Sequence, residues 1–258
     1  MRLSPPIVPP MFQPADQYTA HLHGILGVSG CSAMVASSAF TELARRAITG
    51  LTSEPKLIAL DGVPDCDPLT ELADPAPSVL LQMTSGSTSA PRGASISWRS
   101  LATNLNVMEE LCGMADGQVG GVSWLPLYHD MGLIGVLFQA MTRQRDLQLM
   151  RPDQFIRDPP LRWLKAAANS EHTASPSFGL VYTSRRLKPE DLGDIDLSRL
   201  RTLVVGAEPI NPAHLRAFTD LTAGGHGFLP RCIHAVLRAC RAHPVRHLPP
   251  PGRTAHDG

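Results

Sequence analysis

Apolar residues along the chain fall into two alternating patterns, one at helical spacing and one in short continuous runs. Residues 15–30 have apolar positions at helical spacing and end in glycine, and residues 32–37 have the pattern of a short buried strand. A second predicted helix, 39–51, precedes the strand-like run 56–60. This alternation predicts an α/β sheet with parallel strands.

The same alternation continues beyond a linker rich in Pro and Asp at 61–78. An apolar strand at 78–83 leads into a hydroxyl-rich loop, and a helix is expected near 98–112. Residues 120–130 have the pattern of a strand running into a loop, followed by a buried helix at 131–141. Further predicted elements are strands at 146–150 and 200–205 and helices at 159–170, 177–186 and 211–221. The order is again that of an α/β protein.

The hydroxyl-rich loop reads TSGSTSAPRG and occupies residues 84–93. In a turn that follows a buried strand, backbone N–H groups and hydroxyls can converge on one point, which suits a polyphosphate. We expect Gly86 and Gly93 to let the chain turn without a Cβ clash and Arg92 to supply charge. The Lys-Ser or Lys-Thr pair of a Walker A loop and the G-x-S-x-G elbow of serine hydrolases are absent. A plain polar surface turn is the alternative.

Three motifs resemble those of the adenylate-forming superfamily. The loop at 84–93 matches T-S-G-S-T-G-x-P-K-G at Thr84, Ser85, Gly86, Ser87, Thr88, Pro91 and Gly93. The stretch SWLPLYHDMGLIG at 123–135 is similar to the next motif of the superfamily, in the form found in fatty acyl-AMP ligases, with Trp124, Pro126, His129, Asp130, Met131 and Gly132 in register. The stretch VVGAEPI at 204–210 resembles the strand and turn that lay adenine against backbone in that family. The resemblance covers about residues 5 to 228.

The resemblance implies a fold and a set of ATP contacts. The fold is an α/β fragment of the large N-terminal adenylation domain, with mixed, mostly parallel sheets flanked by helices and no C-terminal lid domain, over residues 1–228. The residues that would hold ATP are Thr84, Ser85, Gly86, Ser87, Thr88, Arg92 and Gly93 at the phosphates, and Gly206, Ala207, Glu208 and Pro209 at adenine. Two positions depart from the motif: Ser89 replaces its usual glycine and Arg92 its usual lysine. Arginine keeps the charge but changes reach and donor geometry.

The reaction implied by the resemblance is attack of a fatty carboxylate on the α-phosphate of ATP, helped mainly by alignment and charge stabilisation. His129 is the catalytic residue that the motif implies, placed where nucleotide and carboxylate meet. The alternative is a His–Asp pair that caps the helix beginning near Met131, because Asp130 is a favourable N-cap. One such pair without partner histidines does not indicate a metal site, so no metal ligand is assigned. ATP and Mg²⁺ are the implied cofactors, although the family's metal-binding glutamate has no counterpart in this chain.

Composition narrows the class of protein further. The 258 residues are 43% hydrophobic and can bury a sizeable core. Lys plus Arg equals Asp plus Glu at 23 each, so no global field favours nucleic acid or an anionic membrane. Five scattered cysteines without a C-x-x-C indicate neither disulfides nor zinc. With no apolar stretch near the roughly 20 residues of a membrane helix, and no signal-peptide core, we expect a cytoplasmic protein without a membrane span.

The last part of the chain differs in character from the rest. From about Gly224 it is crowded with His, Arg and Pro and has no Asp or Glu before Asp257. The Y-G-x-[AT]-E motif, ribose-binding Asp, hinge and catalytic Lys of full-length relatives have no counterpart. Read one nucleotide downstream from the codon of Cys232, however, the gene is permitted to encode AFMPCYGLAEHTLFVT, which contains the first of these motifs. Our hypothesis is a frameshift between Phe228 and Cys232, which makes residues from about 229 to 258 an out-of-frame or disordered tail; the DNA sequence tests it.

The function implied is ATP-dependent activation of a long-chain fatty acid as acyl-adenylate, for transfer to an acyl-carrier protein or polyketide synthase. The absent motifs predict impaired turnover, because each such loss costs on the order of 10² in rate. One alternative is a catalytically dead remnant that at most binds nucleotide or acyl chain. The other is acyl-CoA formation, because the insertion said to separate the two classes lies beyond this chain's end.

Overall fold

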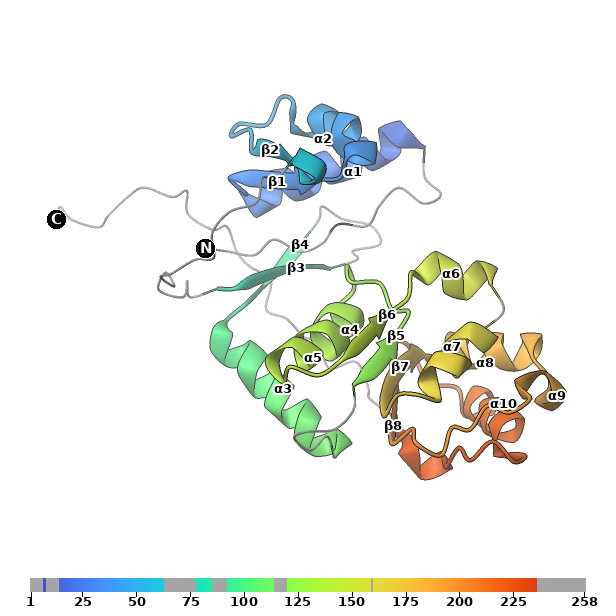
Figure 1. The fold of residues 1–258 in the computed structure, drawn as a ribbon. Helices are drawn as coiled ribbons and strands as arrows, with labels where there is room; N and C mark the ends of the chain where they lie inside the picture. Colours follow the sequence, from blue (N-terminus) through green and yellow to red (C-terminus); the bar gives the residue numbers. More distant parts are fainter. Residues whose placement is uncertain are drawn as a thin grey trace. The chain divides into compact units, whose positions relative to one another are not determined.

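The computed structural model describes residues 7, 14–62, 78–84, 92–113, 120–158 and 160–235 (Figure 1). These residues form two compact units, with the boundary between Trp98 and Arg99. Within the described residues, no helix combines the length and the apolar character that crossing a bilayer requires.

The first unit contains a small parallel sheet and a hairpin. Strands β1 (Ala33–Ala36) and β2 (Lys56–Ala59) pair in parallel, as the helix–strand alternation predicts. Helices α1 (Ala15–Ser29) and α2 (Thr41–Ile48) pack on each other through Leu22, Leu26 and Ala47, and short 3₁₀ turns η1 (Ser38–Phe40) and η2 (Leu60–Gly62) follow β1 and β2. Gly30 ends α1 at a φ of 57°, a left-handed conformation that glycine adopts without strain.

The hairpin consists of β3 (Leu80–Thr84) and β4 (Arg92–Ile96), which pair antiparallel. This antiparallel pair agrees with the expectation of mixed, mostly parallel sheets. The physical reason for the antiparallel pairing is the short connection between the two strands, because a parallel crossover needs a dozen or more residues.

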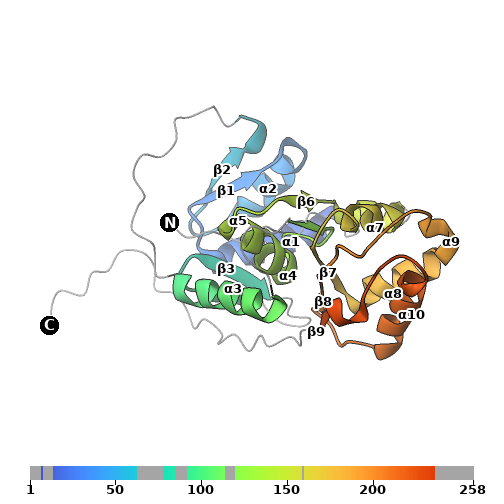
Figure 2. The same cartoon turned by 60° about the horizontal axis from the view of Figure 1, so that its bottom comes forward.

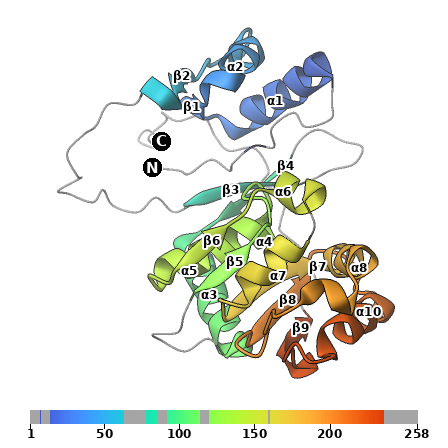
Figure 3. The ribbon, with the colours of Figure 1, turned by 45° about the vertical axis from the view of Figure 1, so that its right-hand side comes forward.

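The second unit is built on a five-stranded parallel sheet in the order β6-β5-β7-β8-β9. Its strands are β5 (Gly121–Ser123), β6 (Leu147–Leu149), β7 (His172–Pro176), β8 (Thr202–Gly206) and β9 (Ile233–Ala235). Helices α3 (Trp98–Cys112), α4 (Asp130–Gly132) and α5 (Gln139–Thr142) lie on one face, and α7 (Leu161–Ala167), α8 (Ser177–Arg186) and α10 (Pro212–Ala223) lie on the other (Figures 2 and 3). Two shorter helices are α6 (Pro152–Arg157) and α9 (Pro189–Leu192).

A series of aromatic rings in contact fills the core between the sheet and the layer of α7, α8 and α10. The Trp124 and Phe155 rings stack with centroids 3.9 Å apart, and Phe155 meets the edge of Trp163 at 5.7 Å. Phe218 continues the series, with its centroid 6.0 Å from that of Trp163. Stacked and edge-to-face rings at these separations favour a defined arrangement. Phe155 therefore fixes the position of Trp124, the first aromatic residue of the 123–135 motif.

The predicted buried helix at 131–141 forms as a helix with an unusual centre. Between α4 and α5 the hydrogen bonding is π-helical over Leu133–Phe138 (η3). Such widened turns are rare and occur frequently at functional sites.

Residues 230–235 form a 3₁₀ turn, Pro230–Cys232 (η4), and strand β9, which pairs in parallel with β8. Residues 236–258 lie outside the described residues. The division of the chain at 228 and the frameshift remain predictions.

Candidate functional site

The predicted phosphate loop connects β3 and β4. Thr84 and Arg92 are register partners at the end of the hairpin where the connecting loop begins and ends. Ser85, Gly86, Ser87 and Thr88 lie outside the described residues. Gly93 is not at a turn, as we expected, but within β4 opposite Met83. It is needed for packing instead, because an added Cβ would come 2.6 Å from Leu81 Cδ1.

His129 lies in the segment that follows β5 and is the N-cap of α4. Its Nδ1 is 3.2 Å from the Met131 amide nitrogen, which also donates to Asp130 Oδ1 at 2.8 Å. The predicted capping by this His–Asp pair is confirmed, with His129 rather than Asp130 at the N-cap position. Nδ1 also lies 2.8 Å from Asp130 Oδ1, and the His129 side chain is 43% exposed.

A glycine fixes the position of this segment. An added Cβ at Gly132 would come 2.3 Å from the Pro126 carbonyl oxygen. That approach is closer than any Cβ tolerates, so Gly132 lets α4 pack directly on the backbone that precedes His129.

The predicted adenine turn follows β8 and contains a strained residue. β8 ends at Gly206, and Ala207 has a φ of 68°. A left-handed conformation is unfavourable for a residue with a Cβ and tends to occur where function or packing requires it. Ala207 therefore marks this turn as a candidate site on conformational grounds.

The side chain of Glu208 is committed to the neighbouring helix. Its Oε1 accepts a hydrogen bond of 2.5 Å from the Phe178 amide at the start of α8. Carboxylates favour helix N-termini because they accept orphan N–H groups and complement the dipole. Glu208 thus ties the adenine turn to the β7–α8 turn and leaves backbone groups of Gly206–Pro209 as the surface for a ligand.

A second connection between the same turns was not predicted from the sequence. Ser177 Oγ lies 2.9 Å from His214 Nδ1 and accepts a hydrogen bond of 3.3 Å from the Asn211 amide. Asn211 is itself the N-cap of α10, accepting from the Ala213 amide at 2.9 Å. With both connections, the turns after β7 and β8 form one bonded unit.

Strand order identifies where these segments meet. β6 lies on one side of β5 and β7 on the other, so the chain reverses direction across the sheet at this point. In open parallel sheets, ligands bind outside the carboxyl ends of the strands at such a switch point. The segments after β5, β7 and β8 carry His129, Ser177 and Ala207, and all three leave the sheet at this edge.

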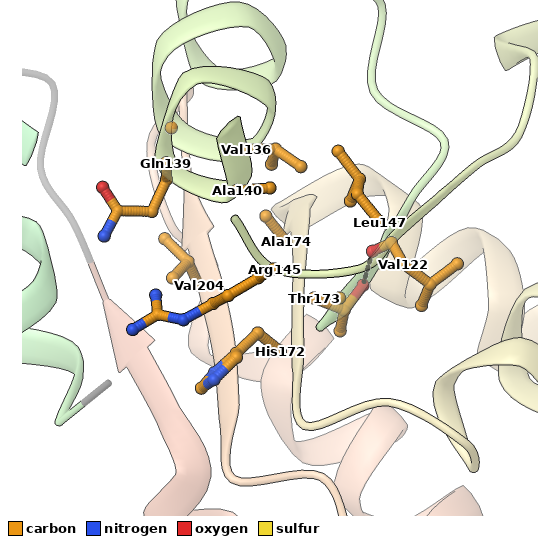
Figure 4. A pocket seen from close by; sticks show the side chains of 12 residues that line it. Val122, Val136, Gln139, Ala140, Arg145, Leu147, His172, Thr173, Ala174 and Val204 are labelled. Carbon is orange, nitrogen blue, oxygen red and sulfur yellow. Dashed lines mark hydrogen bonds between the residues drawn. The ribbon is translucent and has the colours of Figure 1, made fainter. Parts of the chain in front are cut away.

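A cavity of about 50 Å³ lies on the face of the sheet beneath the 130–142 helix, away from the strand ends. Apolar groups from Val122, Val136, Ala140, Leu147, Ala174 and Val204 line most of it, together with Gln139, Arg145, His172 and Thr173 (Figure 4). Gln139 was not predicted as a site residue. The available signal was its position as the single polar side chain within MGLIGVLFQAM.

Two arginines share one carboxylate beside the cavity. The Arg145 guanidinium pairs with the Glu109 carboxylate of α3 at 2.6 Å, and both side chains are nearly buried; Arg143 pairs with the same carboxylate. Burial, together with the positive charges of Arg145 and Arg201, lowers the pKa of His172 to about 4. His172 is therefore neutral at pH 7.

The described residues contain no group of three or more His, Cys, Asp or Glu side chains placed to hold a metal ion. Mg²⁺ in nucleotide enzymes is usually held by substrate phosphates, water and one or two carboxylates, so a metal of this kind would arrive with the nucleotide.

Comparison with known proteins places these features in a family. A model of the AMP-binding enzyme family matches residues 14–230. The long-chain-fatty-acid–AMP ligase FadD32 of Mycobacterium marinum is 34% identical over 233 residues, 82% of this chain and 35% of the relative. A 4-hydroxyphenylalkanoate adenylyltransferase of Mycobacterium tuberculosis is 39% identical over 144 residues, 54% of this chain and 23% of the relative.

Solved structures agree with the sequence comparison. A structure from a study of fatty acyl-adenylate ligases of E. coli and L. pneumophila matches with a TM-score of 0.82 and 29% identity, covering 92% of this chain and 43% of that one. The L. pneumophila fatty acyl-adenylate ligase in complex with acyl adenylate and pyrophosphate matches with a TM-score of 0.71 and 26% identity, covering 86% and 39%. The expected fold class is confirmed as mixed α/β with mostly parallel sheets. The chain spans about a third of the length of the first curated relative.

Proposed function

Because the chain belongs to the AMP-binding enzyme family, we propose that it carries the ATP- and acyl-binding part of an enzyme that activates long-chain fatty acids as acyl-adenylates. The observation that carries this proposal is that the segment with His129 and the turn with the strained Ala207 both follow strands of one parallel sheet and leave it at the same edge. Support comes from FadD32, named as a long-chain-fatty-acid–AMP ligase, and from the similar structure that contains acyl adenylate and pyrophosphate.

In the proposed reaction, a carboxylate oxygen of the fatty acid attacks the α-phosphorus of ATP. The bond from this phosphorus to the bridging oxygen breaks, and pyrophosphate leaves with that electron pair. Rate acceleration in such a displacement comes mostly from alignment and charge stabilisation. The protein's task is therefore to hold adenine, polyphosphate and carboxylate in one geometry.

Adenine would lie against the backbone of Gly206, Ala207, Glu208 and Pro209. The hydrogen bond from the Phe178 amide to Glu208 fixes this turn before a ligand arrives. A preorganised turn loses little conformational entropy on binding, which favours affinity. Glu208 would thus act as a positioning residue for the nucleotide.

His129 would contact the reacting groups through Nε2. Nδ1 also lies 2.8 Å from Asp130 Oδ1, and a carboxylate only accepts, so Nδ1 would carry a proton directed at Asp130. A protonated ring would then also donate from Nε2 to a carboxylate or phosphate oxygen. A donor placed where negative charge develops stabilises the transition state.

The β and γ phosphates would be held by Thr84, Ser85, Gly86, Ser87, Thr88, Arg92 and Gly93 of the hairpin connection. Mg²⁺, bound with ATP, would supply further neutralisation of the phosphates. We propose an acyl-carrier protein as the acceptor of the activated acyl group.

A single-turnover assay tests the proposed function. The protein, in excess over radiolabelled long-chain fatty acid, is incubated with ATP and Mg²⁺, and acyl-adenylate and pyrophosphate are quantified after a quench. We expect both products in equal amounts. His129→Ala should slow their formation on the order of 10²-fold, the typical cost of removing one donor of this kind. The control His21→Ala, an exposed histidine on α1, should have no effect.

Two results would contradict the proposal. One is the absence of acyl-adenylate from folded protein. The other is an equal rate for wild-type protein and His129→Ala. Addition of CoA to the same assay separates acceptors, because a CoA ligase would convert the adenylate to acyl-CoA.

A further inference from the structure

The side-chain amide of Gln139 lines the cavity on the sheet face with both of its polar ends unused. Gln139 is the first residue of α5 and is 4% exposed. Neither its Oε1 nor its Nε2 hydrogen-bonds to any residue that the structure describes. Buried polar groups are nearly always paired, and an unpaired amide destabilises the fold. The pattern therefore indicates a partner from outside the chain.

Two other polar groups at the cavity are already engaged. Thr173 Oγ1 donates to the Val122 carbonyl at 2.8 Å and accepts from Trp163 Nε1 at 3.1 Å. The Arg145 guanidinium is paired with Glu109. In Figure 4, the Gln139 amide and the Arg145 guanidinium extend to the same side of the cavity, while Val136, Ala140 and Ala174 form an apolar wall. His172, the remaining polar side chain of the lining, also has an interaction within the chain, whereas the Gln139 amide has no hydrogen-bond partner among the described residues.

Gly135 lines the cavity four residues before Gln139, and an added Cβ there would meet nothing within 4 Å. Gln139 lies ten residues after His129. The segment between them would be about 15 Å long as an α-helix, and its π-helical part, Leu133–Phe138, makes it shorter. An acyl chain with its carboxylate near His129 would have to run along this helix for its far end to lie beside Gln139.

We propose that this cavity receives the far end of the acyl chain and that Gln139 selects acids carrying a hydroxyl group at that end. The inference rests on the proposed function, because that function places a carboxylate at His129. A hydroxyl both donates and accepts, which matches the two ends of an amide. A terminal methyl offers neither.

The size and polarity of the cavity limit the class of acid that it can accept. The cavity volume of about 50 Å³ is well below the roughly 150 Å³ in which benzene binds, so the end of the chain is a slim alkyl group and not an aromatic ring. A terminal carboxylate would lose its hydration against the apolar wall of the cavity, which is unfavourable.

Calorimetric titration without ATP tests the selection. Fatty acids of several chain lengths are compared with the matched ω-hydroxy and ω-carboxy acids. At the length that reaches Gln139, we expect the hydroxy acid to bind about fivefold to tenfold more tightly than the unmodified acid, the effect of about one added hydrogen bond. The ω-carboxy acid should bind no more tightly than the unmodified acid.

Two variants and a control identify the residue responsible. Gln139→Met replaces the amide with an unbranched apolar side chain and should remove the preference for the hydroxy acid. Gln148→Met, which changes an exposed glutamine on β6, should keep it. Gly135→Leu fills the space along the helix and should weaken binding of both acids. Gln139→Met should also raise the urea midpoint of unfolding, because it removes an unpaired buried amide.

Several results would overturn the inference. These are equal affinities for hydroxy and unmodified acids at every length, a preference that persists in Gln139→Met, or no binding of any acid, each of which leaves the cavity to water. A lower urea midpoint for Gln139→Met would reveal a structural partner for the amide and would also overturn it. Acyl-adenylate formation without a preference refutes this inference alone, whereas a preference without acyl-adenylate refutes the proposed reaction alone.

Discussion

Gly179 in α8 offers a sharp test of how the site is packed. An added Cβ there would come 2.4 Å from Ser175 Oγ and 2.8 Å from Trp124 Cζ2. Neither neighbour has room to move, because Ser175 is fully buried and Trp124 is stacked on Phe155 at 3.9 Å. Gly179→Ala is therefore expected to push Trp124 and, with it, the segment that leads to His129.

Two opposing effects determine how much Gly179→Ala changes the free energy of unfolding. In a helix interior, alanine is favoured over glycine by about 1 kcal/mol. Overpacking a rigid core costs about 1–3 kcal/mol, and the two short contacts argue for the upper part of this range. We therefore expect Gly179→Ala to lower the free energy of unfolding by about 1–2 kcal/mol.

Urea unfolding followed by tryptophan fluorescence measures the change, because Trp124 and Trp163 both lie in the second unit. Gly135→Ala is the matched control, since its Cβ would meet nothing within 4 Å; it should raise stability by up to about 1 kcal/mol. If Gly179→Ala also raised stability, as helix propensity alone predicts, the close packing of Trp124 on α8 would be refuted.

Three further predictions follow from buried charge and backbone strain. Glu109→Ala removes the carboxylate that pairs with the nearly buried Arg145 and should lower the unfolding free energy by about 3 kcal/mol in a chemical denaturation; an unchanged value would contradict the pair. His172 has a folded pKa of about 4 against an ordinary 6.5. Its neutral ring therefore contributes about 3 kcal/mol to the free energy of unfolding above pH 6.5, and this contribution is lost as the pH falls to 4. His172→Gln should make the unfolding free energy less dependent on pH over this window. Ala207→Gly relieves the left-handed strain at φ 68° and should raise stability by about 0.5–1 kcal/mol in thermal melts, whereas a loss would show that the methyl group packs usefully.

The order of helices and strands could largely be predicted from apolar spacing, yet the central strand could not. β7 reads HTASP, and all five residues are buried. Such a composition does not have the pattern of a strand, because the apolar signal is missing. Tertiary contacts replace that signal: Thr173 has two hydrogen-bond partners, and burial keeps His172 neutral. The short helices α6 and α9 were missed for a related reason, since each spans fewer than two turns.

The candidate site shows the same division. The motif at 123–135 located His129, and local sequence rules anticipated the His–Asp capping that the structure contains. The strain at Ala207, the hydrogen bond between Glu208 and the Phe178 amide, and the unpaired amide of Gln139 depend on residues distant in sequence. Spacing along one chain cannot reveal such contacts, because they arise only when neighbouring strands bring separate turns together.

Calorimetric titration with a hydrolysis-resistant acyl-adenylate analogue tests the central claim most directly, because binding needs no turnover. If the edge of the sheet that carries His129 and the Ala207 turn forms one site, the analogue should bind one per chain and more tightly than AMP or the fatty acid alone. His129→Ala should weaken this binding, and His21→Ala should not. An analogue that binds no more tightly than AMP would contradict the claim that nucleotide and acyl group share this site.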